Sequence, residues 1–273
     1  MTTERIGLIA GNGRFPVIFA RAAREQGVEV VAVAHVGETD ESLASLVAET
    51  TWVRVGELGK IIGTLTRAGV QRAVMAGGIG KPRHIRDMRP DLRGAAFLAR
   101  TRSLKDDVLL RGIAAELERD GITVVSSTLF LGDLVPAVGT LTRHAPGARI
   151  WEDIRFGFQV AKDIGRWDIG QSVVVKRGAV LAVEGIEGTD AAIRRGGELG
   201  RGEVVVVKVS KPTQDLRFDV PAVGLGTIEV MREVGAVALA IEAGRTLMLD
   251  RADLVAAADA ARITIVALSA SAA

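Results

Sequence analysis

The sequence contains no cysteine and no tyrosine, and its 273 residues include only seven phenylalanines and three tryptophans. The absence of cysteine excludes disulfide frameworks, thiol nucleophiles and thiolate metal sites. The three histidines, His35, His84 and His144, lie far apart and form no zinc-binding pattern such as HExxH, so any metal ion is expected to have oxygen ligands. A nucleic-acid-binding protein is disfavoured, because the basic residues are not interleaved with aromatic residues on which bases stack.

Long apolar runs are also absent. The first apolar run, residues 6–10, is too short for the core of a signal peptide, and no later run approaches the length of a membrane span. We therefore expect a cytoplasmic protein.

The formal net charge is only +2, but the charge is unevenly distributed. Residues 81–105 contain eight basic and two acidic residues, a local excess of 8 − 2 = +6. Such a surface is suited to phosphates or anionic lipid head groups, with Phe97 and Leu98 between the charges. The alternative is an ordinary solvated helix face.

Alanine, valine, leucine and isoleucine make up most of the apolar residues, which suits buried parallel strands covered by helices. In the first 130 residues, apolar strands alternate with helices at short spacing. The predicted strands are 6–10, 28–34, 52–55, 72–76 and 122–126, and the predicted helices are 15–26, 40–48, 57–68 and 104–120. This alternation predicts an α/β fold with a Rossmann-like, doubly wound parallel sheet over residues 1–140.

The composition changes near residue 140. Residues 140–147 are polar, contain proline and glycine and lack an apolar period, so we predict a linker over 141–149. The remaining residues, 150–273, predict a mixed α/β carboxyl-terminal domain with more strands than the first.

Two glycine turns follow predicted strands in the first domain. Gly11 and Gly13 lie between a strand and a helix, where backbone N–H groups can receive a phosphate. Gly77 and Gly78 follow another strand and precede Lys81, which suits an anion. For the first turn, a plain tight turn is an equally good interpretation, and for the second the alternative is a flexible, charged loop.

Neither turn matches a nucleotide-binding motif. Pro16 replaces the third small residue of a dinucleotide fingerprint, and His35 ends the second strand where a ribose-binding acid is expected. The second turn lacks the GxxxxGK[ST] spacing of a P-loop. A nicotinamide-dependent oxidoreductase and a nucleoside triphosphatase are therefore disfavoured.

The most informative segment is KPTQDLRFDVP, residues 211–221, which leaves a predicted strand and is bracketed by prolines. In an extended chain Asp215, Arg217 and Asp219 would project from one face. Two carboxylates beside a guanidinium suit a divalent cation next to a phosphate. The alternative is a surface ion-pair cluster of Arg217 with its two neighbours.

Two other stretches place polar residues beside predicted elements. Gln171 precedes a predicted strand, and Thr189 lies at the start of a predicted helix, where it can cap the helix or contact an anion. Asp106 and Asp107 fall in the first turns of a long helix, so the helix dipole explains them without a catalytic role.

Taken together, these motifs resemble one family. IGLIAGNGRFP near the amino terminus, GGIGKP, KDD, DIGQSVVVKRGAVLAVEGIEGTDAAIRR and KPTQDLRFDVPAVG are similar to the LpxI-type UDP-2,3-diacylglucosamine pyrophosphatases. The resemblance covers nearly the whole chain in the same order, and the carboxyl-terminal motifs are its specific part.

The resemblance implies a hydrolase of lipid A biosynthesis. It would convert UDP-2,3-diacylglucosamine and water into 2,3-diacylglucosamine 1-phosphate (lipid X) and UMP, with Mg²⁺ or another divalent cation. It also implies a Rossmann-like amino-terminal domain, a catalytic carboxyl-terminal domain with substrate between the two, and a homodimer. Because the substrate carries two acyl chains, the protein is expected to meet the inner face of the cytoplasmic membrane as a peripheral protein.

The family's essential aspartate lies in a QDxRxDxP motif, which here offers Asp215 and Asp219, and we favour Asp219. On this hypothesis both acids bind the metal ion or position the water, while the basic residues neutralise the diphosphate. The predicted catalytic residues are Asp219, Asp215, Arg217 and Lys211, and the predicted metal ligands are Asp219 and Asp215. The predicted substrate-binding residues are Gly11, Gly13, Gly77, Gly78, Lys81, Gln171, Thr189 and Gln214.

A second hypothesis stays open beside this one. A nucleotide-sugar-binding or regulatory protein without turnover would need the glycine turns and Thr189, but not two acids beside Arg217. Metal-dependent release of UMP distinguishes the two hypotheses.

Overall fold

A computed structural model describes residues 4–79, 89–101, 106–212, 214–218 and 220–269 of the chain. The chain forms two compact units. The first unit consists of residues 1–132 together with 215–219, and the second consists of residues 133–214 and 220–273. The chain therefore leaves the second unit, contributes five residues to the first, and returns.

The first unit contains a five-stranded sheet in the order β3-β2-β1-β4-β5, with all neighbouring strands parallel. Its strands are β1 (Arg5–Ala10), β2 (Glu29–His35), β3 (Glu49–Val53), β4 (Arg72–Ala76) and β5 (Thr123–Val124). The order reverses between β1 and β4, so the carboxyl ends of these two strands form the topological switch point of the sheet, where ligands bind in open α/β folds. The predicted Rossmann-like, doubly wound sheet is confirmed.

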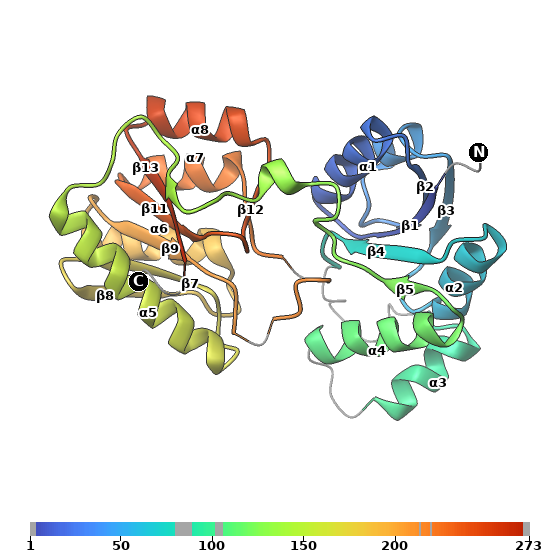
Figure 1. The fold of residues 1–273 in the computed structure, drawn as a ribbon. Coiled ribbons are helices and arrows are strands. Elements are labelled where there is room, and N and C mark those ends of the chain that lie inside the picture. The colour runs from blue at the N-terminus through green and yellow to red at the C-terminus, as the bar shows by residue number, and fades with distance from the viewer. Residues whose placement is uncertain (1–3, 80–88, 102–105, 213, 219, 270–273) are drawn as a thin grey trace. The chain divides into compact units, whose positions relative to one another are not determined.

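Helices cover both faces of this sheet (Figure 1). The helices are α1 (Phe15–Glu25), the 3₁₀ helix η1 (Glu41–Ser45), α2 (Leu58–Arg67), α3 (Leu92–Arg100) and α4 (Asp106–Arg119). Helix α1 lies on one face, and α2 and α4 lie on the other, where their apolar side chains form a core with β1, β2, β3 and β4. Helix α3, which the sequence analysis did not predict, packs beside α2.

The second unit contains a six-stranded mixed sheet in the order β6-β13-β11-β9-β7-β8. Its strands are β6 (Gly139–Thr140), β7 (Ser172–Lys176), β8 (Ala179–Val183), β9 (Val205–Lys208), β11 (Ala238–Glu242) and β13 (Thr264–Leu268). Strands β9, β11 and β13 are parallel, whereas β7 is antiparallel to both β8 and β9. A separate parallel pair is formed by β10 (Ala222–Val223) and β12 (Leu247–Met248). The predicted mixed α/β domain is confirmed.

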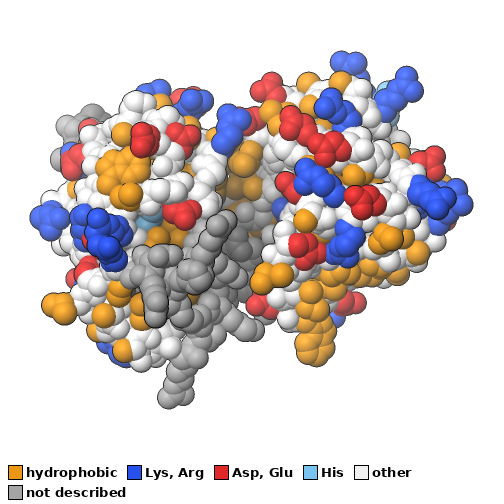
Figure 2. Space-filling view, turned by 180° about the vertical axis from the view of Figure 1, so that it is seen from behind, with side chains coloured by type: hydrophobic (Ala, Val, Ile, Leu, Met, Phe, Trp, Pro, Cys, Tyr) orange, Lys and Arg blue, Asp and Glu red, His pale blue; other side chains and the backbone are white. Residues whose placement is uncertain are grey.

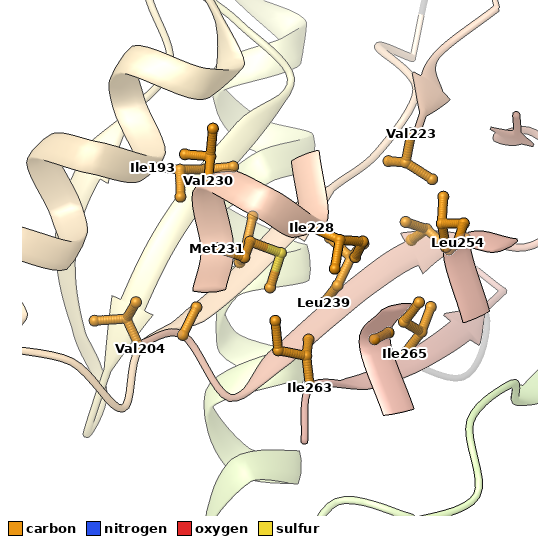
Figure 3. Close-up of a cluster of buried hydrophobic side chains, with 14 of the residues drawn as sticks. Ile193, Val204, Val223, Ile228, Val230, Met231, Leu239, Leu254, Ile263 and Ile265 are labelled. Carbon is orange, nitrogen blue, oxygen red and sulfur yellow. The ribbon is translucent and has the colours of Figure 1, made fainter. Parts of the chain in front are cut away.

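The second sheet is also covered on both faces (Figure 1). The helices are α5 (Ala148–Arg166), α6 (Thr189–Gly200), α7 (Leu225–Glu233) and α8 (Arg251–Ala260). Helix α5 packs on one face through Ile154 and Phe158. Helices α6, α7 and α8 pack on the other, and Figure 3 shows their side chains meeting those of β9, β11 and β13 in one apolar cluster. Successive strand residues alternate between the two cores, which explains the uninterrupted apolar runs of β9 and β11.

The boundary between the units lies at residues 132 and 133, earlier than the predicted boundary at 140 and 141. Strand β6 pairs with β13, so residues 139 and 140 belong to the second sheet. The predicted linker, 141–149, lies in the second unit as well, because Leu141 and Thr142 bond to Ile265 and Arg143 bonds to Asp259. A short edge strand without apolar alternation left no signal in the sequence.

No helix in the described part of the chain is both long enough and apolar enough to cross a membrane.

Candidate functional site

The predicted catalytic segment, residues 211–219, is shared by the two units. Residues 215–219 belong to the first unit, where the Phe218 side chain is 6% exposed and packs in the core with residues of α2 and α4. The backbone N–H of Phe218 donates to the carbonyl oxygen of Asp215 at 3.1 Å, so this part of the segment is a turn. The predicted extended conformation is wrong here, because burial of Phe218 and the bonds of Asp215 favour a turn.

Asp215 and Arg217 form a close ion pair within this turn. The Arg217 side chain donates to both carboxylate oxygens of Asp215, at 2.8 Å from Nη2 to Oδ2 and at 3.0 Å from Nε to Oδ1. The backbone N–H of Arg217 donates to the same carboxylate at 3.1 Å. These hydrogen bonds from Arg217 hold the pKa of Asp215 below its usual range. Asp215 is therefore an ionised carboxylate whose two oxygens are already engaged.

Two further contacts fix the guanidinium of Arg217. It lies over the Phe218 ring, 4.7 Å from the ring centroid, and its Nη1 lies 3.7 Å from Oε1 of Glu118 on α4. The hydrogen bond and charge of Asp215 raise the pKa of Arg217, so it keeps its charge. Asp219 and Lys81, the other charged residues predicted for this site, lie outside the described residues.

The two glycine turns lie against each other at the carboxyl ends of β1 and β4. The N–H of Gly11 donates to the Ala76 carbonyl at 2.8 Å, and the N–H of Asn12 donates to the Gly78 carbonyl at 2.6 Å. A Cβ atom on Gly11 would collide with the carbonyl of Gly78, and one on Gly77 would collide with the carbonyl of Asn12. These glycines are thus required for the close approach of the two turns, and binding of substrate at Gly11, Gly13, Gly77 and Gly78 stays a prediction.

Gly13 differs from the other glycines of these turns. Its φ is +80°, and no atom lies within 4 Å of the position that its Cβ would occupy. The space beside it is open, and it directly precedes α1. Of the four predicted glycines, Gly13 has the surroundings that best suit a ligand.

A polar network in the second unit unites two predicted residues at one carboxylate. Glu184, which follows β8 and is buried, accepts a hydrogen bond from the Thr189 hydroxyl at 2.9 Å and one from the Gln171 backbone N–H at 3.4 Å. Thr189 in turn accepts from Nζ of Lys208, the last residue of β9, at 3.2 Å. Gln171 and Thr189, 18 residues apart in the sequence, are thereby placed at the same edge of the sheet.

Two polar atoms of this network have no hydrogen-bond partner among the described residues. They are Oγ of Ser172 and Oε1 of Gln171, and both are buried. Ser172 is the cross-strand partner of Lys208 in the β7–β9 ladder, so the two side chains are neighbours on one face. Buried polar atoms without partners are rare in folded proteins and accompany sites that hold water or ligands.

Lys211 and Gln214 form the beginning of the catalytic segment in the second unit. Nζ of Lys211 donates to Oδ1 of Asp168 at 2.6 Å, and its backbone N–H donates to Oε1 of Gln214 at 2.9 Å. The N–H of Gln214 returns a hydrogen bond to the Lys211 carbonyl at 3.0 Å. Gln214 thus closes a local turn, and its binding role stays a prediction.

The described residues provide no group of three histidine, aspartate or glutamate side chains that could hold a metal ion. Of the two predicted ligands, Asp215 is paired with Arg217 and Asp219 lies outside the described residues. The described residues therefore do not test the predicted metal site, and Mg²⁺ stays a prediction from the resemblance.

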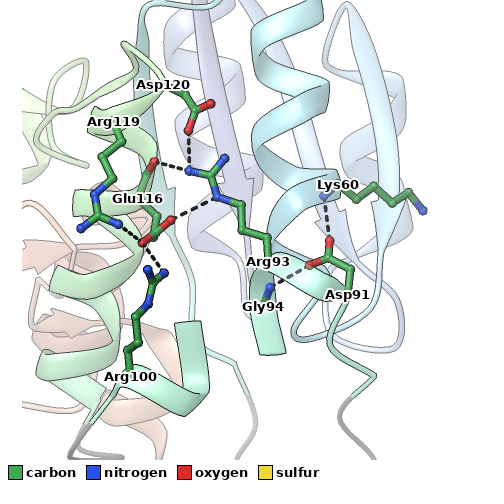
Figure 4. Close-up of polar contacts among 8 residues, drawn as sticks. All are labelled: Lys60, Asp91, Arg93, Gly94, Arg100, Glu116, Arg119 and Asp120. Atoms are coloured by element: carbon green, nitrogen blue, oxygen red, sulfur yellow. Dashed lines mark hydrogen bonds and ion pairs between the residues drawn. The ribbon is translucent and has the colours of Figure 1, made fainter. Parts of the chain in front are cut away.

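Part of the basic segment predicted to face phosphate or membrane turns inward. Figure 4 shows Arg93, Arg100 and Arg119 around the buried carboxylate of Glu116, with Nε of Arg93 3.1 Å from Oε2 and Nη2 of Arg100 3.1 Å from Oε1. The Phe97 ring packs against Gly112 of α4. These pairs tie α3 to α4, so Arg93 and Phe97 serve the fold.

The other charged side chains do not form a patch of one sign on the face that Figure 2 shows. On the face drawn in Figure 2, basic and acidic side chains are interspersed over the described surface. Residues 81, 83, 86, 102 and 105 of the basic segment lie outside the described residues. Arg89 is exposed beside Leu92, which is 93% exposed, so a docking role is retained as a prediction for this end of the segment.

Sequence reasoning missed several polar residues of the second unit. Each follows or ends an apolar strand and lies buried at the carboxyl edge of the sheet or beside it; they are Glu184, Lys208, Ser210 and Glu242. The signal was present in the runs VVVVKVS, LAVEG and ALAIEAG, where a charged residue ends an otherwise apolar strand. In an open α/β sheet this is the edge at which sites are built.

The comparisons with known proteins agree with the division of the chain. The LpxI N-terminal domain matches residues 5–134, and the LpxI C-terminal domain matches residues 137–266. The chain is 35% identical over 267 residues to UDP-2,3-diacylglucosamine pyrophosphatase LpxI of Caulobacter vibrioides, covering 94% of each chain.

Solved structures give weaker likenesses. The biotin carboxylase domain of Hydrogenobacter thermophilus 2-oxoglutarate carboxylase is 15% identical, with a TM-score of 0.29 over 66% of this chain and 36% of that one. An N5-carboxyaminoimidazole ribonucleotide synthetase is 13% identical, with a TM-score of 0.29 over 69% and 40%. This chain spans well under half of either structure, and the likenesses carry no argument about function. The two domain matches and the relative matched over 94% of its length show that the chain belongs to the LpxI family.

Proposed function

We propose that this chain hydrolyses UDP-2,3-diacylglucosamine to 2,3-diacylglucosamine 1-phosphate and UMP in lipid A biosynthesis. The observation that supports this most strongly is the 35% identity to a UDP-2,3-diacylglucosamine pyrophosphatase across 94% of both chains. The KPTQDLRFDVP segment, in which two acids flank an arginine, supplies the residue types that such a reaction needs.

Attack of water on a phosphorus atom of the diphosphate places negative charge on the nonbridging and leaving oxygens. We assign neutralisation of this charge to Arg217 and Lys211, which are paired with Asp215 and Asp168. Arg217 is held by its stacking on Phe218, so it is preorganised for a planar, bidentate contact with a phosphate. Lys81 is the third cation in the proposal.

Asp219 is the proposed essential carboxylate, which orients the attacking water or holds a metal ion. Asp215 is assigned chiefly to Arg217, because that guanidinium engages both of its oxygens. A divalent cation, expected to be Mg²⁺, would supply Lewis-acid stabilisation of the diphosphate oxygens.

In the second unit, Gln171, Thr189 and Lys208 are proposed to contact the nucleotide or the sugar. Lys208 is 8% exposed and directed to the start of α6, which is not capped by a side chain of its N-cap residue, Gly188. A buried ammonium beside a helix start suits a phosphoryl oxygen. Binding by Gly13 at the start of α1 belongs to the same proposal.

Association with the inner face of the cytoplasmic membrane and a homodimeric state complete the proposal. Because the substrate carries two acyl chains, the protein needs contact with a membrane surface in order to reach the substrate. Arg89 and the exposed Leu92 are the described residues that support such contact.

The test is release of UMP from UDP-2,3-diacylglucosamine by Asp219→Ala. We expect kcat to fall by about 10²–10⁴-fold, the range for loss of a group that handles the water proton, while the thermal unfolding midpoint is retained. Asp253→Asn, which changes an exposed acid on α8, is the matched control and should keep the wild-type rate.

The same assay tests the metal and the alternative function. With EDTA, wild-type release of UMP should stop, and it should return on addition of Mg²⁺. Tight binding of the substrate by the wild-type protein with no release of UMP under any metal condition would establish the alternative, a nucleotide-sugar-binding protein. Undiminished turnover by a folded Asp219→Ala protein would refute the assignment of Asp219.

A further inference from the structure

A buried acid in the second unit holds the chain immediately before the catalytic segment. Glu242, the last residue of β11, has a side chain only 3% exposed. Its Oε2 accepts hydrogen bonds from the backbone N–H of Ser210 at 2.8 Å and from the Ser210 hydroxyl at 2.6 Å. Ser210 is itself fully buried and directly precedes Lys211.

A lysine on α5 completes this arrangement. Nζ of Lys162 lies 2.6 Å from Oε2 of Glu242 and donates to the Ser210 carbonyl at 2.8 Å. Glu242 on β11 therefore bonds to the backbone N–H and hydroxyl of Ser210, and Lys162 on α5 bonds to its carbonyl. The printed backbone bonds of Lys211 and Gln214, by contrast, are to each other.

The sheet does not hold Ser210. The β9–β11 ladder ends with the pair Lys208 and Ile241, one residue before Glu242. Beyond this pair the Glu242 carboxylate takes the place of a strand neighbour for the N–H of Ser210. Without it that N–H would be buried and unbonded.

Packing holds the next two residues on one side only, where Gly165 of α5 lies close to Lys211 and Pro212. Pro212 is exposed and lines an open hollow of about 530 Å³, to which Lys162, Glu242 and Arg245 also contribute. Nε of Arg245 lies 3.8 Å from the other oxygen of Glu242. The polar groups of Ser210 itself are thus held by Glu242 and Lys162.

A buried ion pair is a costly way to stabilise a fold, since apolar residues of similar volume often do as well or better. It can instead specify one arrangement of the chain. We propose that Glu242, together with Lys162, is a positioning residue of the pyrophosphatase reaction, which fixes Ser210 and thereby the start of the segment that carries Lys211, Asp215, Arg217 and Asp219. This inference rests on the proposed function.

The test compares Glu242→Gln with a matched control in the same unit. Asp153, which lies on α5 as Lys162 does, is a buried carboxylate. Its oxygens accept hydrogen bonds from the N–H groups of Arg177 at 2.8 Å and Gly178 at 2.7 Å, in the turn between β7 and β8. Asp153→Asn, like Glu242→Gln, removes one buried charge and keeps one acceptor. Of the two acids, only Glu242 bonds to the residue directly before the catalytic segment.

We expect Glu242→Gln to lower kcat for UMP release by about 10–100-fold, since small displacements of catalytic groups have effects of this size. We expect KM to change by less than about threefold, because ground-state binding is retained. Asp153→Asn should keep the wild-type kcat even where its thermal midpoint falls as far. Equal effects on kcat in the two variants, or no effect in Glu242→Gln, would overturn the proposal.

A double variant separates positioning from loss of stability. In Lys162→Met/Glu242→Gln the unpaired buried ammonium is removed, so the stability lost in Glu242→Gln should be recovered while kcat stays low. Recovery of kcat together with stability would show a purely structural role and refute the proposal.

A readout independent of turnover keeps the inference distinct from the proposed function. Exchange of the Ser210 amide hydrogen should be at least about tenfold faster in Glu242→Gln than in Asp153→Asn, because its acceptor is weakened. If the wild-type protein releases no UMP, the proposed function fails, and unchanged exchange at Ser210 would still refute the positioning role.

Discussion

At the scale of single residues, His35 shows how burial sets a charge state. It ends β2, is 6% exposed, and its Nδ1 lies 2.8 Å from the Ala10 carbonyl, directly before the Gly11 turn. Burial lowers the pKa of His35, an effect only partly offset by the hydrogen bond to Ala10 and by the charge of Glu38. The imidazole is therefore neutral in the folded protein near pH 7.

This state gives the stability a pH dependence of known sign. In the unfolded chain the imidazole takes up a proton near pH 6.5, whereas the folded protein resists it. The stabilisation is fully present above about pH 6.5 and is lost as the pH falls toward the lowered folded-state pKa. We expect the free energy of unfolding of the wild type to decrease between pH 7 and 5, measured by urea denaturation, and that of His35→Gln to decrease less.

Parallel curves for the two proteins would contradict this account. His144→Gln, at an exposed histidine in a loop of the second unit, is the matched substitution control. The comparison isolates the buried imidazole from the carboxylates that titrate below it.

The sequence indicates which residues form the candidate site but not the conformation in which they are held. Asp215, Arg217 and Lys211 stand out because charge is concentrated in a proline-bracketed segment. Their conformation could not be derived, because the pairing of Asp215 with Arg217 competes with the extended chain and only the burial of Phe218 decides between them.

At the scale of elements, the two glycine turns act as one unit. Gly11 and Gly77 allow the backbones after β1 and β4 to come into contact. The turns after the two strands are thereby bonded to each other at the switch point of the first sheet. The sequence indicates each turn separately, but their contact follows from the strand order, which no local pattern contains.

Substitution of these glycines should reveal the contact. Gly11→Ala would place a methyl group against the Gly78 carbonyl, and we expect it to reduce the free energy of unfolding by about 3 kcal/mol. Gly13→Ala meets no neighbour and suffers only from its φ of +80°, so a loss of about 1 kcal/mol is expected. Denaturation by urea measures both, and a larger loss for Gly13→Ala would contradict the packing of the two turns.

The elements themselves were largely predictable. The buried strands of both sheets are uninterrupted apolar runs ended by glycine or a charged residue, and those runs gave the α/β class. Helix α3 was not predicted because it begins with the exposed Leu92 and its stability depends on Asp91, which caps it, and on Arg93, which binds α4. Such tertiary contacts leave no local period.

At the scale of the whole molecule, the near-neutral charge conceals an uneven distribution. At Glu116, for example, two arginines of the basic segment, Arg93 and Arg100, are paired with a buried acid. Membrane contact by Arg83, Arg86 and Arg89 stays a prediction.

We expect the protein to bind vesicles containing anionic lipid and Arg86→Ala/Arg89→Ala to bind about 30-fold more weakly, as each basic residue near such a surface contributes about 1 kcal/mol. Arg194→Ala, which removes a half-exposed arginine of α6, should bind as the wild type does. Sedimentation with vesicles at two salt concentrations measures this, and equal binding by all three proteins would exclude docking through this segment.

The contribution of residues 215–219 to the first unit also affects folding of the chain during its synthesis on the ribosome. Phe218 belongs to the core beneath α2 and α4, yet it is translated after most of the second unit. The nascent first unit must therefore wait with an incomplete core until residue 218 emerges. Synthesis of the predicted catalytic segment and completion of that core therefore coincide, and we expect a chain truncated before residue 215 to lack both.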